Sequence, residues 1–277
     1  MQGITSGDDE QTRQPGRAWS LVGPQTTALI VAPLIALGLV GWYLTVRQAG
    51  DMHGMVTGLG QVGTGMPNEM AAPAFLAMWV WMMVAMMFPA IGPVVLAHRK
   101  VVQARNEGAM PTIAFVAGYL LAWTVIGLAP LAAFLGFRNL PMTAADGPWL
   151  RVLAGAVVVV AGAYQFTPLK NTCLRACRSP LGFVMTHDFG TGATGALRAG
   201  IIHGAYCVGC CWALMSLLVI VGLMNLVWMV ALAVVFLAEK NWRHGVVLTK
   251  AAGVVLMFLG VAIAAVPSVL PHISGSG

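Results

Sequence analysis

Long runs of apolar residues constrain this chain more than any other feature of its sequence. A helix needs about 20 apolar residues to cross the hydrocarbon core of a bilayer. Runs of this kind occupy residues 27–46, 73–97, 111–137, 148–166, 196–223, 226–238 and 246–266, and the sixth is the shortest. We therefore predict an all-α fold, a polytopic membrane helix bundle with about seven transmembrane helices.

The composition supports a single membrane domain. The chain is 58% hydrophobic and only 9% charged, whereas soluble domains have about 25% charged residues. Residues 1–22 are polar, and we predict a disordered cytoplasmic tail there. No other hydrophilic stretch is long enough to fold separately, so residues 23–270 form one transmembrane helical domain in this prediction.

Lys and Arg residues predict the orientation of the bundle. With the N-terminus inside, twelve of the 15 basic residues lie on the inner side, which is the distribution expected of a membrane protein. The net charge of +6 does not indicate nucleic-acid binding, because the basic residues lie in loops and form no stripe. The predicted partner of the surface is the lipid bilayer.

The segment 196–239 is too long for one span, and its turn-like break is Gly222-Leu223-Met224-Asn225. A hairpin at this break gives seven helices and places the C-terminus outside. One long interrupted helix is the alternative, and it would place the C-terminus inside.

The run 196–223 contains an unusual set of soft metal ligands. At about 100° per residue, His203, Cys207 and Cys210 fall within one narrow arc, and Cys211 lies at its edge. A thiolate in hydrocarbon is costly unless a metal or a cation compensates it. We therefore predict a metal site, with simple packing of small side chains as the alternative. Because Cys210 and Cys211 are adjacent, either Gly209 loosens the helix or one thiol faces elsewhere.

Methionines extend this set toward the outer surface. The second apolar run contains two helical stripes of Met, and Met215 follows the cysteines by one turn. The stripe residues are Met78, Met82, Met83, Met86 and Met87. Taken alone they suit packing, but the predicted topology places them at the depth of the cysteines. Thioethers with thiolates favour Cu(I), whereas Zn(II) seldom takes Met, so copper is the predicted ion and zinc or another transition metal the alternative.

Two smaller groups suggest sites on either side of the membrane. Met52, His53 and Met55 would suit copper capture in the outer loop, unless that loop holds Met by chance. Cys173 and Cys177 lie on the inner side, where a helix would bring them together as a second metal site, a redox pair or two ordinary thiols. We interpret Glu239 and Lys240 as snorkelling anchors, whose charged ends reach the membrane surface at the inner face.

Three motifs carry a resemblance to a known family. They are MWxWMMxAMMxPA at Met78–Ala90, TPLKxxCxxxCRSP at Thr167–Pro180 and HxxxCxGCCWxLM at His203–Met215. Their order and spacing over residues 70–265 resemble a bacterial family of predicted metal-binding integral membrane proteins. The resemblance implies a multi-pass protein of the bacterial cytoplasmic (inner) membrane that binds a metal ion and works with a small soluble partner protein.

The sequence supports three functions. Copper transport, delivery or enzyme maturation explains the sulfur ligands most directly. A copper-dependent membrane oxidoreductase or oxygenase, or a subunit of one, is the alternative, although such centres use several His ligands and His203 is the only deep one. A structural or assembly subunit is the second alternative. No catalytic residue stands out, so the sequence leans away from an enzyme.

Overall fold

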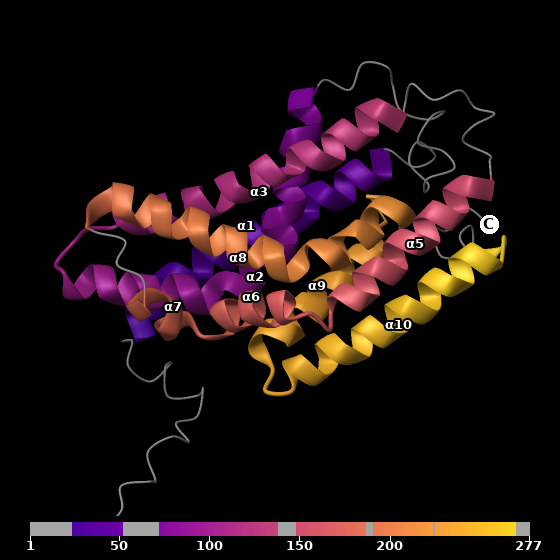
Figure 1. The fold of residues 1–277 in the computed structure, drawn as a ribbon. Coiled ribbons are helices and arrows are strands. Elements are labelled where there is room, and N and C mark those ends of the chain that lie inside the picture. The colour runs from indigo at the N-terminus through magenta and orange to yellow at the C-terminus, as the bar shows by residue number, and fades with distance from the viewer. Residues whose placement is uncertain (1–23, 52–71, 138–147, 187–190, 224, 270–277) are drawn as a thin grey trace, which may run out of the picture.

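The computed structural model describes residues 24–51, 72–137, 148–186, 191–223 and 225–269, and within them it has helices and no strand (Figure 1). The helices are α1 (Pro24–Asp51), α2 (Ala72–Ala104), α3 (Met110–Phe137), α5 (Pro148–Tyr164), α6 (Pro168–Arg178), α7 (Pro180–Thr186), α8 (Gly192–Val221), α9 (Leu226–Asn241) and α10 (Gly245–Ala265). Each predicted apolar run coincides with one helix to within a few residues. The predicted tail and the capture residues Met52, His53 and Met55 lie outside the described residues.

Five of these helices, α1, α2, α3, α8 and α10, are long and apolar enough to cross a membrane. Helices α5 and α6 meet the same test together, although they are bent by 63° where they join. Helix α9 has 16 residues and is shorter than a usual span. The chain is therefore a polytopic membrane helix bundle of five or six candidate spans, and the count of seven stays a prediction.

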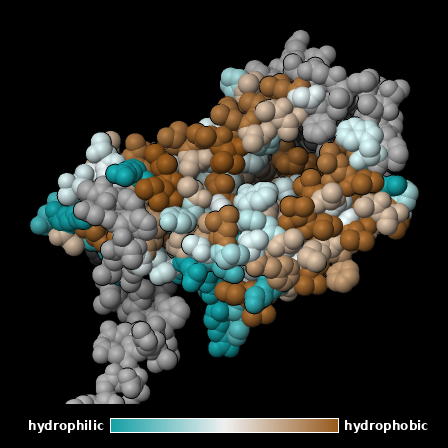
Figure 2. Space-filling model, viewed as in Figure 1, coloured by the Kyte–Doolittle hydropathy of each residue, from teal (hydrophilic) through white to brown (hydrophobic). Residues whose placement is uncertain are grey.

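The outer surface is apolar, as a lipid-facing surface must be. Val227 is 78% exposed and Phe258 is 73% exposed. In Figure 2 hydrophobic side chains cover most of the visible face, and hydrophilic ones gather at its left end and lower edge. A continuous apolar surface of this extent marks contact with a membrane or a partner rather than with water.

Helices α2 and α8 form the inside of the bundle. Helix α8 packs against α3, α5, α6 and α9, while α2 packs against α1, α3, α7 and α9. Helices α5 and α10 run side by side at one edge (Figure 1). The Met residues of α2 and the Cys residues of α8 are buried.

The predicted hairpin between α8 and α9 is confirmed. Helix α8 ends at Val221, and the next residue, Gly222, has a φ of +109° that suits a residue without a Cβ. Asn225 then caps α9, with its side-chain oxygen accepting from the amide of Trp228 at 3.3 Å. Lys240 Nζ lies 3.1 Å from Cys207 Sγ, whereas one straight helix would separate these residues by about 50 Å. Helix α9 therefore folds back along α8.

A second turn returns the chain to the bundle after α5. Thr167 caps α6, accepting from the amide of Lys170 at 3.2 Å, and Pro168 occupies the first turn, where its missing N–H has no cost. The resulting bend directs α6 against α8 and α9. This bend brings Lys170 and Cys177 to the centre of the molecule.

Close contact between α3 and α8 depends on small residues. A Cβ on Gly118 would collide with the carbonyl of Leu197, whereas a Cβ on Gly136 of the same helix would meet nothing within 4 Å. Overpacking costs about 1–3 kcal/mol, and Ala otherwise favours a helix by about 1 kcal/mol over Gly. We expect Gly118→Ala to lower the thermal unfolding temperature in detergent and Gly136→Ala to leave or raise it. Equal temperatures for both variants would show that this helix contact is not tight.

Candidate metal centre

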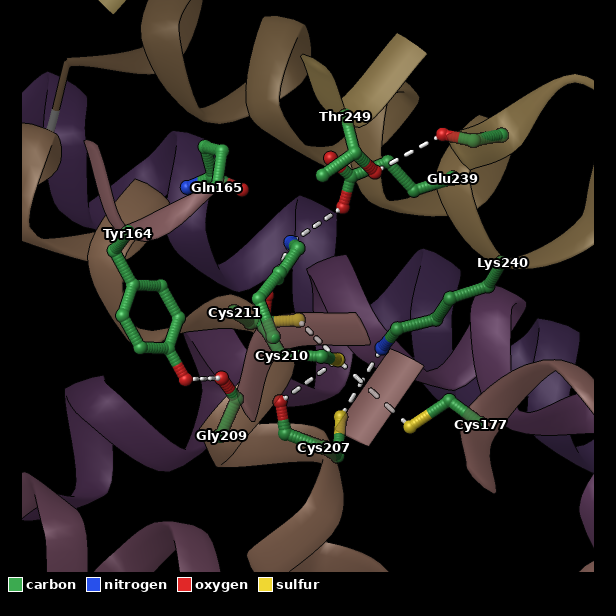
Figure 3. A network of polar contacts seen from close by, with 12 residues as sticks. Tyr164, Gln165, Cys177, Cys207, Gly209, Cys210, Cys211, Glu239, Lys240 and Thr249 are labelled. Carbon is green, nitrogen blue, oxygen red and sulfur yellow. Dashed lines mark hydrogen bonds and ion pairs between the residues drawn. The ribbon is translucent and has the colours of Figure 1, made fainter. Parts of the chain in front are cut away.

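Three cysteine thiols from two helices meet in the interior. The sulfur atoms of Cys177 on α6 and of Cys207 and Cys210 on α8 all lie within 4.8 Å of one another, and all three side chains are buried. The Cys177 and Cys210 sulfurs are 3.8 Å apart (Figure 3). Among the described residues these three make up the group of Cys, His and acidic side chains placed closely enough to hold one ion. We name them the three-cysteine centre.

The geometry of this centre fits a soft metal ion. Thiolate sulfur binds such metals at about 2.3 Å, which places three sulfurs around one ion about 4 Å apart. The Cys177–Cys210 separation of 3.8 Å is close to this value. Sulfur ligands select Cu(I) or Zn(II) over hard ions. The spacing and the chemistry of these thiols therefore fit a soft ion such as copper.

Neither alternative predicted for Cys210 and Cys211 describes their arrangement, because the helix is regular and the two sulfur atoms lie in contact. Helix α8 runs unbroken through Gly209, so that glycine does not loosen it. Cys211 contacts the Cys210 sulfur at 3.3 Å but lies outside the three-cysteine centre. Gly209 instead permits a close approach of α6, because a Cβ there would lie 2.6 Å from the Cys173 sulfur.

The side chain of Lys240 is directed toward the sulfur atoms of the centre, whereas the sequence predicted it at the membrane surface. Its ammonium lies 3.1 Å from Cys207 Sγ and 3.6 Å from Met87 Sδ. The Tyr119 hydroxyl contacts the same Cys207 sulfur at 3.2 Å. The snorkelling interpretation is wrong because the Lys240 side chain is directed into the bundle and is only 5% exposed, although the next residues of the chain are exposed.

Glu239 is also buried and forms an ion pair across the bundle. Its Oε2 lies 2.9 Å from Lys170 Nζ, and both side chains are inaccessible to solvent. Lys170 also donates to the carbonyl of Cys210, and Arg178 donates to the carbonyl of Glu239. Sequence reasoning missed this pair, although ionisable residues in a membrane segment are a signal of function. The pair links α6 and α9 to the helix that carries the cysteines.

His203 lies one turn before Cys207 and outside the three-cysteine centre. It is 1% exposed, and its Nδ1 has no hydrogen-bond partner among the described residues. The ring packs edge-on against Phe183 at 4.8 Å between centroids. Its predicted role as a ligand is not supported by a contact with the cysteines, and the nitrogen remains a free acceptor or donor in an aromatic surrounding.

The predicted methionines are buried, and one of them reaches the site. Met87 contacts Lys240, and through it the Cys207 sulfur. Met215, on α8 beyond Cys211, lines an apolar cavity instead. The remaining stripe residues, Met78, Met82, Met83 and Met86, lie in the core of α2. Their part in binding stays a prediction.

The structure separates the two cysteines of the predicted inner site. Cys177 joins the three-cysteine centre, while Cys173, one turn earlier on α6, approaches Gly209. Nearby, the Tyr164 hydroxyl donates to the Gly209 carbonyl at 2.6 Å, a polar contact between α5 and α8. The sequence alone could not bring Cys177 to Cys210, because their contact depends on the bend before α6.

Comparison with known proteins identifies the family of the chain. The family model of PpoB2, described as a copper chaperone, matches residues 76–263. The chain belongs to the PpoB2 copper chaperone family. The match spans α2 to α10 and so includes all three residues of the three-cysteine centre and the Lys170–Glu239 pair of this PpoB2 member. No curated protein and no solved structure matches the sequence.

Proposed function

We propose that this protein is a membrane copper chaperone that accepts Cu(I) at the three-cysteine centre and delivers it for the maturation of a copper enzyme. The three buried thiols carry the proposal, because their spacing suits one soft ion. Membership of a copper chaperone family and the apolar helices support it. Copper is here a cargo that the protein passes on.

The surrounding sulfur atoms suggest a route for the ion. Thioethers bind Cu(I) more weakly than thiolates, and passage requires sites that an ion can leave. Met87 lies beside the centre, and the other Met residues of α2 extend along the same helix. In this proposal they guide copper to the cysteines, and Met52, His53 and Met55 capture it first.

We further propose a seven-span arrangement in a bacterial inner membrane, with the N-terminus inside. Each predicted run is a helix in the structure. Helix α9 folds back along α8 and supplies the seventh crossing in this arrangement. The positive-inside distribution of Lys and Arg supports the orientation. A small soluble protein would then receive or supply the ion at the surface.

Metal loading tests the proposal directly. The full-length protein, purified in detergent without oxygen, is incubated with Cu(I), freed of unbound ions and analysed for copper and sulfur by plasma mass spectrometry. We expect about one copper per chain that resists a weak Cu(I) chelator and moves to a strong one. A wild-type protein that keeps no copper after loading would refute copper handling.

One observation favours a second candidate, an oxidative copper enzyme. A cavity of about 340 Å³ lies between α2, α3, α5 and α8, and its wall includes Trp79, Trp123 and Met215. An enzyme needs a substrate pocket near its metal, and Met215 lies one turn from Cys211. Oxygen consumption by the copper-loaded protein with apolar substrates would support this candidate, and transfer of copper without oxygen consumption would support the chaperone.

A further inference from the structure

Lys240 lies beside the three-cysteine centre, although copper binding by the three thiols does not require a lysine there. A lysine buried in a membrane bundle is costly unless an opposite charge or strong acceptors surround it. Lys240 is buried, and its neighbour Glu239 has its own partner in Lys170. The two contacts described for the Lys240 ammonium are both with sulfur. One is with Cys207 (Figure 3) and the other is with Met87. Its charge is therefore directed at the centre itself.

The ammonium lies within the electrostatic range of any ion that binds there. A metal about 2.3 Å from the Cys207 sulfur would lie no more than roughly 5.4 Å from the ammonium, because the nitrogen is 3.1 Å from that sulfur. Two positive charges repel each other in proportion to the product of their charges. A divalent ion therefore meets twice the repulsion that a monovalent ion meets.

We propose that Lys240 makes the three-cysteine centre selective for monovalent soft ions, Cu(I) and Ag(I), over thiophilic divalent ions such as Zn(II) and Cd(II). This inference rests on the proposed metal binding and specifies its substrate class. Three thiols alone bind Zn(II) and Cd(II) well, so cysteines without a fixed cation do not exclude them. The lysine supplies the discrimination through charge and leaves the sulfur ligands unchanged.

The ratio of two affinities isolates this effect. Loss of Lys240 also removes a hydrogen bond to Cys207, which changes the binding of both ions in the same direction. The ratio of Ag(I) to Cd(II) affinity cancels that common part and retains the part that depends on ion charge. For one extra unit of charge at about 5 Å and an effective dielectric constant of about 20, this ratio would change roughly 300-fold.

The test is equilibrium dialysis of the detergent-purified full-length protein against Ag(I) and Cd(II) in competition, with elemental analysis of both ions. Lys240→Met and Lys240→Gln remove the charge, and Gln keeps an N–H donor in case Met does not fold. Lys250→Met, which removes an exposed lysine from α10, is the matched control. We expect the Ag(I)/Cd(II) ratio to fall at least tenfold in the folded Lys240 variant and to stay at the wild-type value in the control.

Two outcomes would overturn the inference, and they differ in what else they refute. If the wild type binds Ag(I) through its cysteines but the Lys240 variants keep its Ag(I)/Cd(II) ratio within twofold, the role of Lys240 fails and metal binding stands. If the wild type binds neither ion, the proposed metal centre and the role of Lys240 both fail.

Discussion

Replacing Cys177 by Ser is expected to remove bound copper, whereas replacing Cys173 by Ser is expected to leave it in place. Both residues lie on α6, one turn apart, and both are buried. Only Cys177 belongs to the three-cysteine centre. Loss of groups that merely orient a metal ligand costs 10–100-fold in affinity, so loss of a direct ligand should cost at least about 100-fold.

This comparison is measured as Cu(I) affinity by chelator competition, with copper content per chain as a second readout. Cys173→Ser controls for the removal of a buried thiol from α6, because the two substitutions are chemically identical. Retention of copper by Cys177→Ser would show that α8 alone holds the ion. Loss of copper in both variants would favour the pair on α6 that the sequence suggested.

Replacing Glu239 by Ala is expected to destabilise the fold strongly. The change would leave the Lys170 ammonium buried with the Cys210 carbonyl as its remaining described acceptor. Removing one member of a buried ion pair costs about 3–5 kcal/mol. We expect a large fall in the thermal unfolding temperature in detergent and a low yield of monodisperse protein. A change of less than about 1 kcal/mol would mean that the pair contributes little.

A double replacement separates the pair from a general effect of mutation. Buried ion pairs can often be replaced by apolar side chains of similar volume without loss of stability. The combination Lys170→Met with Glu239→Met should therefore recover most of the stability that Glu239→Ala loses. The interaction energy follows from the cycle formed with the two single Met variants. Additive losses in the double variant would contradict direct pairing.

The sequence predicts the helices and the inward face of α8 because both follow from local patterns. Apolar runs of the right length define the spans, and the helical spacing of His203, Cys207 and Cys210 places them on one arc. All three are at most 1% exposed. The break at Gly222 is equally local, since a residue with positive φ and a capping Asn225 ends one helix and starts the next.

The composition of the centre could not be predicted because it depends on where helices return to the bundle. Cys177 reaches Cys210 only through the 63° bend between α5 and α6. Lys240 reaches Cys207 only because α9 folds back along α8 and directs this side chain inward. A lysine at a helix end usually extends to the membrane interface. The position of Lys240 near the end of α9 therefore predicts the interface and not the interior. The ligands are determined by which residues of different helices lie close together, and the periodicity of a single helix does not contain that information.

The depth of the cysteines also has a kinetic consequence. Cys207 and Cys211 have no accessible surface, and Cys210 has 1%, so no acceptor molecule can touch them while the bundle is closed. Local opening of helices precedes any exchange at such a position. The rate of copper release to an acceptor should therefore stop rising as acceptor concentration increases. Its limiting value would measure how often the helices part, independently of the strength of the copper–sulfur bonds.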